Sequence, residues 1–186
     1  MKTLLFTLLC CCTMLSAQLF INEIDYDQSG SDHDEFIEIA GPAGTYSNVT
    51  IDLINGNGNA IYETVQISSL TLSNQSDGYG FHAEYISGIQ NGAPDGVQLS
   101  VGGVIVDAVA YEGSMNDTGG NAMEEAGEDT ADEENQSLSR LGLDGTSWQE
   151  LAITPGAINT NQVMSDEIEI QGCTDDTAYN YNPDAT

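Results

Sequence analysis

The stretch IDYDQSGSDHDEF, residues 24–36, places five acidic side chains around one histidine, a composition that suits binding of a hard cation. Asp25, Asp27 and Ser29 stand at positions 1, 3 and 5 of the calcium-loop template, and Gly30 stands at the turn position 6. The template also needs a bidentate glutamate at position 12, but Phe36 is there. The flanking segments favour strands rather than helices, so a helix–loop–helix calcium hand is excluded.

A half-loop closed by the acids that follow remains a calcium-site hypothesis. Carboxylates on Asp32, Asp34 and Glu35 could supply the missing oxygens. The alternative is an acidic, solvated loop that joins two strands and holds no ion. The candidate calcium ligands are Asp25, Asp27, Ser29, Asp32, Asp34 and Glu35.

Two further carboxylates, Glu23 and Glu38, lie in the segments on either side of this loop. Phe36 and Glu38 share one face of the predicted strand EFIEI, so a buried Phe36 would draw Glu38 inward, where it needs hydrogen-bond donors. Arg140 is the base that could pair Glu38 with a full charge.

A second hypothesis is a metal-dependent extracellular hydrolase of phosphoesters or polysaccharides that uses the carboxylates between Asp25 and Glu38. It predicts a concave pocket in which several of them converge with His33 or His82. A glycosidase also needs two carboxylates about 5–10 Å apart beside sugar-stacking aromatics. Trp148 is the only tryptophan, and a core position suits it better.

Other catalytic patterns are missing from the sequence. The two histidines are far apart, no H-x-x-x-H zinc spacing occurs, and there is no G-x-S-x-G nucleophile motif. Cys173 is better explained as half of a disulfide than as a nucleophile. We therefore expect a non-catalytic protein with no cofactor other than calcium.

The N-terminus predicts export. Residues 1–17 have an early lysine, an apolar run of twelve residues and a small residue at the end, the layout of a secretory signal peptide. The run is too short to span a bilayer, so no membrane insertion is expected after cleavage. Three of the four cysteines would leave with the peptide, and Cys173 would stay alone in an oxidising compartment. We expect a secreted or cell-surface protein.

Charge limits the classes of partner. Once Lys2 is removed with the signal peptide, Arg140 is the only base against 30 acids. Such a surface repels phosphate backbones and anionic lipid, so direct nucleic-acid binding is not expected. A protein or a polysaccharide at the cell surface is the expected partner.

Apolar residues recur with a period of two along most of the chain, which predicts an all-β sandwich or barrel. Val49, Ile51 and Leu53 alternate with polar residues, and NGNGN after them signals a hairpin turn. VIVDAVAY is apolar on both faces, as in a central strand. The acidic segment 112–135 interrupts the pattern and is expected to be a mobile solvated loop or, because of its length, a functional loop.

Four segments in this order resemble the bacterial lamin-tail domain: LFINEIDYDQSGSDHDEFIEIAGP, DGVQLSVGGVIVDAVAYEG, NQSLSRLG and SWQELAITPGAIN. The resemblance covers residues 19–159 and implies an immunoglobulin-like β-sandwich with a binding or architectural role. In bacteria such domains often accompany extracellular hydrolases, so an accessory role beside one is the alternative. The shared N-E and E-F-I-E patterns imply that Glu23 and Glu38 are structural hydrogen-bond anchors.

The C-terminal stretch GCTDDTAYNYNPDAT resembles the start of a repeat common in secreted proteins of Bacteroidota, which normally continues to a second cysteine. We expect the partner of Cys173 to lie beyond Thr186. The expected organisation is a signal peptide (1–17), a lamin-tail-like domain (18–162), a linker (163–171) and the beginning of this repeat (172–186).

Overall fold

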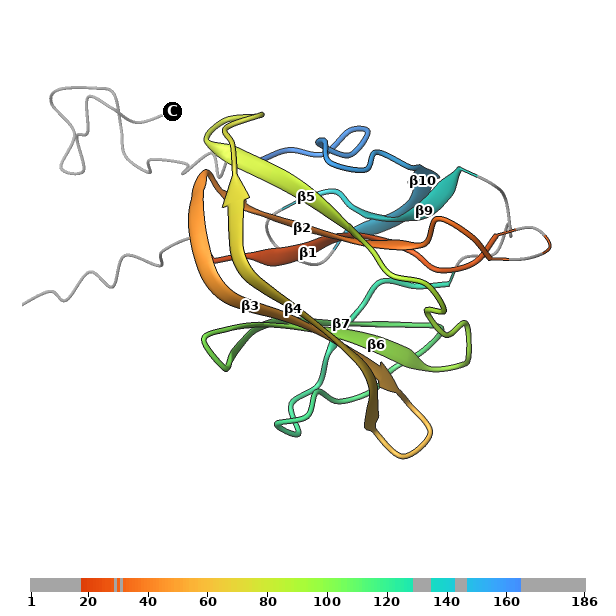
Figure 1. Cartoon of the computed structure of the whole chain (residues 1–186). Helices are drawn as coiled ribbons and strands as arrows, with labels where there is room; N and C mark the ends of the chain where they lie inside the picture. Colours follow the sequence, from red (N-terminus) through yellow and green to blue (C-terminus); the bar gives the residue numbers. More distant parts are fainter. Residues whose placement is uncertain (1–17, 29, 31, 129–134, 143–146, 165–186) are drawn as a thin grey trace, which may run out of the picture.

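A computed structural model describes residues 18–28, 30, 32–128, 135–142 and 147–164, in which the regular structure consists of ten strands. The strands form two five-stranded sheets that lie in two layers (Figure 1). This arrangement confirms the prediction of an all-β sandwich. Across the described residues, no helix is long and apolar enough to cross a membrane.

Each sheet mixes strands that are distant in sequence. The first sheet has the spatial order β10 (Trp148–Ala152), β9 (Gln136–Arg140), β1 (Phe20–Asp25), β2 (Phe36–Pro42), β5 (Tyr79–Tyr85). The second has the order β4 (Ala60–Leu72), β3 (Gly44–Asn55), β6 (Asp95–Val101), β7 (Val104–Tyr111), β8 (Glu124–Glu125). All neighbouring strands pair antiparallel except β7 and β8.

The alternating residues place one face of each strand in the layer between the sheets. On β3, Val49, Ile51 and Leu53 are completely buried. Tyr26 and Tyr111 come from opposite sheets and bring their rings to 4.4 Å between centroids. Full burial of one such side chain stabilises a fold by about 1.5–3 kcal/mol, so this layer is the main source of stability.

The predicted hairpin is present. β3 and β4 pair along their length, and the turn between them uses Gly58 and Asn59 with φ of 97° and 52°, which these residue types tolerate. In Figure 1 the hairpin curves from the second layer toward the β2–β5 edge of the first. There the backbone N–H of Ala43 donates to the carbonyl of Gly78 at 2.7 Å.

The acidic segment after β7 is packed over its described part, residues 112–128. Met123 is 7 % exposed and lies against Ile54 and Ala110 on the outer face of the second sheet. Ala126 is also buried, and its N–H donates to the carbonyl of Ala110 at 2.8 Å. This part is therefore not the loop solvated throughout that the sequence predicted, because Met123 and Ala126 pack on the sheet. Residues 129–134 lie outside the described residues.

The chain returns to the first sheet after β10. Val163 donates its N–H to the carbonyl of Leu141 at 2.9 Å, and Met164 is buried against Ala40 and Phe81. The first two residues of the predicted linker therefore pack on the sandwich. The predicted signal peptide, the rest of that linker and the C-terminal repeat with Cys173 lie outside the described residues.

Candidate functional site

The acidic stretch forms the loop between β1 and β2, as predicted, and Gln28 holds it closed. The Gln28 side chain donates to Asp25 Oδ1 at 2.7 Å and accepts the backbone N–H of His33 at 2.8 Å. Its own backbone N–H donates to Asp32 Oδ1 at 3.4 Å. Asp25 and Gln28 are each 5 % exposed, so the centre of the loop is a buried polar cluster rather than a solvated turn.

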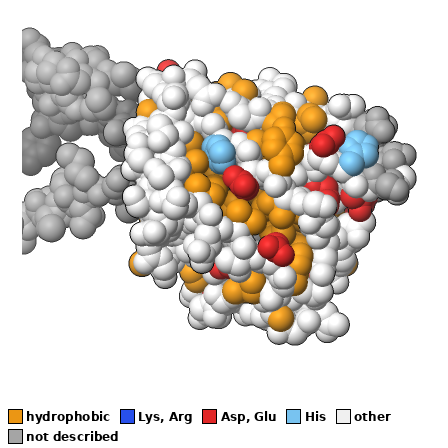
Figure 2. All heavy atoms as spheres, viewed as in Figure 1, with side chains coloured by type: hydrophobic (Ala, Val, Ile, Leu, Met, Phe, Trp, Pro, Cys, Tyr) orange, Lys and Arg blue, Asp and Glu red, His pale blue; other side chains and the backbone are white. Residues whose placement is uncertain are grey.

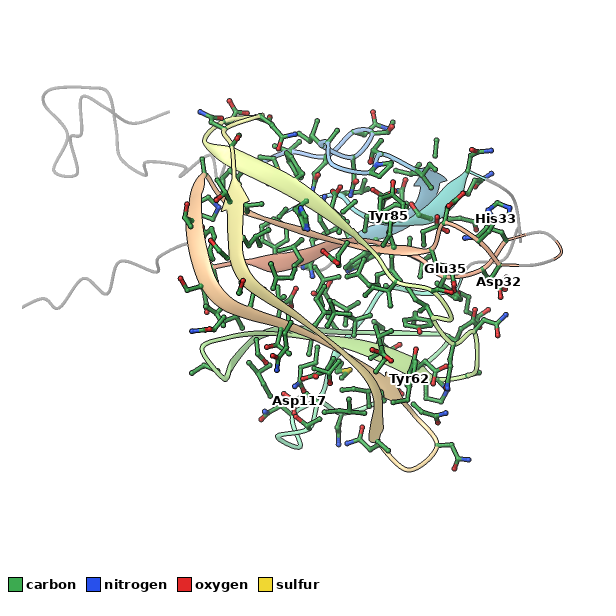
Figure 3. The ribbon with its side chains drawn as sticks, viewed as in Figure 1. Asp32, His33, Glu35, Tyr62, Tyr85 and Asp117 are labelled. Atoms are coloured by element: carbon green, nitrogen blue, oxygen red, sulfur yellow. The ribbon has the colours of Figure 1, made fainter. Side chains whose placement is uncertain are left out.

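Glu35 connects this loop to the segment after β5. Its carbonyl accepts the N–H of Ile86 at 3.0 Å, and its carboxylate Oε2 accepts the N–H of Gly88 at 2.6 Å. Burial raises the pKa of Glu35, the hydrogen bond from Gly88 opposes that shift, and the nearby charge of Asp32 adds to it. Figure 3 shows Asp32 and Glu35 together at the end of the sandwich where this loop lies.

A surface pocket of about 350 Å³ opens beside the loop. Tyr85 stands at its wall with 59 % of the residue exposed, and its ring lies 5.7 Å from that of the buried Phe36. On the same wall Asp34 Oδ2 lies 3.5 Å from His33 Nδ1. The residues that line the pocket are Asp25, Gln28, His33, Asp34, Phe36, Tyr85, Asn135 and Ile153.

The charge around this pocket has one sign. Arg140, the single lysine or arginine among the described residues, is 3 % exposed, so it adds no basic side chain to their surface. Figure 2 agrees: carboxylates and hydrophobic side chains share the visible face, on which no Lys or Arg is seen. Tyr85 and the carboxylates of Asp25 and Asp34 therefore line this pocket with no lysine or arginine of the described chain beside them.

Glu23 and Glu38 lie away from this pocket, opposite each other on β1 and β2 and completely buried. Glu23 Oε1 accepts the Ser137 hydroxyl at 2.5 Å and the Thr154 N–H at 2.9 Å, and Oε2 accepts the Thr154 hydroxyl at 3.0 Å. Burial raises the pKa of Glu23, and these donors oppose the rise. The predicted hydrogen-bond anchor is thus present for this residue.

Glu38 is held in the same manner. Oε1 accepts the Asn22 side-chain amide at 2.8 Å, and Oε2 accepts the Gly156 N–H at 2.5 Å. Burial raises the pKa of Glu38 to about 8, against the hydrogen bond from Asn22 and with the help of the neighbouring Glu23. Both glutamates therefore fasten the segment after β10 to the first sheet.

Arg140 does not pair with Glu38, contrary to the sequence expectation. Its guanidinium donates to Asp107 Oδ2 and to Glu124 Oε2, each at 3.0 Å, and its Nε donates to the carbonyl of Ile21 at 2.8 Å. Asp107 and Glu124 come from the second sheet, so Arg140 joins the two layers. The indole N–H of Trp148 also donates to Glu124, and the tryptophan ring lies 4.8 Å under the guanidinium.

The candidate residues therefore separate into groups. Asp25, His33 and Asp34 meet at the pocket, Asp32 and Glu35 adjoin below it, and Ser29 lies outside the described residues. His82 lies on β5 and pairs with Glu84 at 3.0 Å instead. Within the described part of the chain, no three His, Cys, Asp or Glu side chains already converge as a metal-binding set.

Sequence reasoning missed Gln28 and Tyr85. Gln28 is one polar residue among many in the loop, and nothing local indicates that its side chain bridges Asp25 and His33. Tyr85 is the last residue of β5. The alternation of this strand predicts which face each side chain is on, but its position beside Asp34 depends on the β2–β5 register. No family model, no curated protein and no solved structure matches the chain.

Proposed function

We propose that this protein is a secreted, non-catalytic binding module with a sandwich of the immunoglobulin-like lamin-tail type. Its pocket between the β1–β2 loop and β5 binds a cationic side chain of an extracellular partner protein. The observation that carries the proposal is the exposed ring of Tyr85 beside the carboxylates of Asp25 and Asp34.

The chemistry of the pocket favours a lysine or arginine. An ammonium or guanidinium within about 6 Å of an aromatic face gains about 0.5–1 kcal/mol at an exposed site. Asp34 is exposed and Asp25 is buried, so one carboxylate can meet the cation early and the other can hold it inside the pocket. A pocket of about 350 Å³ admits the end of one long side chain.

The buried carboxylates support a non-catalytic role. Glu23 and Glu38 accept hydrogen bonds from the protein on both oxygens and have no exposed surface on which to meet a substrate. The carboxylates that do reach the pocket, Asp25 and Asp34, would have to serve the alternative of a metal-dependent hydrolase. Turnover of a phosphodiester or an oligosaccharide that disappears in Asp25→Asn would establish that alternative and contradict the proposal.

Calorimetric titration with short oligoarginine and oligolysine peptides tests the proposal, and neutral oligosaccharides serve as the comparison ligands. We expect saturable binding of the peptides that weakens with added salt, because the attraction is between charges and is screened. Tyr85→Ala and Asp34→Asn should each weaken the binding about two- to fivefold.

The matched controls separate the pocket from the general negative charge. Asp77→Asn removes an acid that, like Asp34, lies at a positive φ in a turn, and Ile61→Ala removes an exposed apolar side chain on β4. Both should bind peptides as the wild type does. Equal weakening by Asp34→Asn and Asp77→Asn, or selective binding of a neutral oligosaccharide, would overturn the proposal.

A further inference from the structure

Glu35 ends the β1–β2 loop and is a buried carboxylate with one oxygen left without a hydrogen-bond donor. The residue is 3 % exposed, and Gly88 donates to Oε2. Oε1 is the one buried side-chain oxygen or nitrogen that lacks a partner among the described residues. The backbone N–H of Ile89 also favours the charged form of Glu35. A buried, unsatisfied oxygen costs about 1–3 kcal/mol, so its retention calls for an explanation.

The described chain has no base to offer this oxygen. Arg140, its single lysine or arginine, already forms salt bridges with Asp107 and Glu124 of the second sheet. The nearby His33 places its ring nitrogen Nδ1 3.5 Å from Asp34. No lysine or arginine of the described residues therefore supplies a positive charge at Glu35.

Two further carboxylates of the loop act on Glu35 through their charge. The negative charge of Asp32, and to a smaller extent that of Asp27, raises the pKa of Glu35, and Figure 3 shows Asp32 beside Glu35. Asp32 is exposed, and its Oδ1 accepts one long bond of 3.4 Å from the Gln28 N–H. Repulsion among acids becomes attraction when a divalent cation lies between them.

We propose that Glu35, Asp32 and Asp27 bind a calcium ion at the base of the β1–β2 loop. Only oxygen ligands are offered, and calcium takes six to eight of them in flexible geometry. Glu35 provides the fixed ligand, because Gly88 and the β-sheet hold it. Asp32 moves in from solvent, and backbone carbonyls and water fill the remaining positions, which agrees with the absence of three converged carboxylates in the described residues.

The structure alters the candidate ligand set from the sequence. Asp25 starts the calcium-loop template, but its Oδ1 accepts the Gln28 side chain and it lines the neighbouring pocket instead. Glu35, one position short of the template's closing glutamate, supplies the buried oxygen.

The ion would also fix the wall of the proposed binding pocket. Glu35 lines a second hollow of about 230 Å³ together with Asp34 and Tyr85, which also line the peptide pocket. Calcium should therefore strengthen peptide binding. This coupling rests on the proposed function, whereas calcium binding itself does not.

Calorimetric titration of the chelator-treated protein with calcium chloride tests the site directly. We expect one saturable site in the wild type and a thermal midpoint that rises by several degrees with calcium and falls again with chelator. Glu35→Gln and Asp32→Asn should each weaken calcium binding at least tenfold. Glu63→Gln, which removes an exposed acid from β4, should leave it unchanged.

The possible outcomes separate the explanations. Identical melting curves with calcium and with chelator would overturn the proposal, and so would saturable binding that Glu35→Gln and Asp32→Asn leave intact. Sodium chloride at matched ionic strength is the control, and it should not raise the thermal midpoint as calcium does. An equal rise would show that calcium only screens the negative surface, which would also overturn the proposal. If Glu35→Gln does not fold, the exposed Asp32 decides alone. Loss of peptide binding in Tyr85→Ala with calcium binding retained would separate the two proposals.

Discussion

Replacing Glu38 by glutamine tests whether this carboxyl group carries its proton in the folded protein at neutral pH. Glu38 is completely buried, and burial raises its pKa from 4.5 to about 8. The hydrogen bond from Asn22 favours the ionised form, while the neighbouring Glu23 disfavours it. Arg140 is occupied by other carboxylates and offers no compensation.

The sign of the pH dependence follows from these values. Because the folded pKa lies above the unfolded one, the folded state binds the proton more tightly, and its contribution is complete below about pH 4.5. That contribution is lost as the pH rises toward about 8. At about 1.36 kcal/mol per pKa unit, the shift corresponds to about 5 kcal/mol of unfolding free energy across this range.

Glu38→Gln has no proton to lose, so its stability lacks this slope. Its amide group turns an N–H toward either the Asn22 or the Gly156 donor, which costs about 1 kcal/mol for one lost hydrogen bond. We therefore expect the variant to be about 1 kcal/mol less stable than the wild type at pH 4.5 and about 4 kcal/mol more stable at pH 8.5.

Urea unfolding of both proteins from pH 4.5 to 8.5, followed by circular dichroism, measures the difference. A buried acid that does not act on Glu38, such as Asp107, has a raised pKa in both proteins, so its contribution to the slope largely cancels. Glu63→Gln, an exposed control, should differ from the wild type by a constant amount within about 0.5 kcal/mol. A free-energy difference between Glu38→Gln and wild type that stays flat over this range would refute the reasoning.

Three further substitutions test how the fold is held together, each by urea unfolding at a fixed pH. Asn159→Ala should lower the free energy of unfolding by about 2–3 kcal/mol, because it removes the side-chain amide that donates to the carbonyls of Asn22 and Arg140. A loss below about 0.5 kcal/mol would contradict this. Arg140→Met should cost about 3–5 kcal/mol, since it strands two largely buried carboxylates; a more stable variant would show that their burial costs less than assumed. Gly80→Ala should destabilise by more than 2 kcal/mol because the added Cβ would lie 2.2 Å from the carbonyl oxygen of Ser73, and an unchanged midpoint would mean that the two backbones separate freely.

Local patterns were sufficient for many of the strands and for the acidic loop. The turn NGNGN lies between two alternating runs, so the β3–β4 hairpin needs no information from elsewhere in the chain. The acidic loop between β1 and β2 is predicted on the same local basis. Calcium binding at this loop stays a prediction. The sequence alone does not show that Glu35 Oε1 is buried without a hydrogen-bond partner.

Long-range contacts are what the sequence could not supply. Burial of Glu38 follows from the alternation in EFIEI, but its donor Gly156 lies 118 residues further along the chain. Strand β7 shows the same limit. Its two apolar faces predicted a central strand, but β8 beside it has only two residues, and the segment carrying Met123 covers its outer face instead. Two apolar faces indicate only that both faces of a strand are covered, and a packed loop can cover a face as well as another layer can.

Titration of the isotope-labelled protein with an oligoarginine peptide, followed in a nitrogen–proton correlation spectrum, shows whether a cationic peptide binds at the pocket beside Tyr85. We expect saturable shifts confined to the β1–β2 loop and to the other residues that line the two hollows around Tyr85, which are residues 85–87, Asn135 and Ile153. Shifts spread evenly over the acidic surface, or strongest on the β3–β4 hairpin, would contradict it.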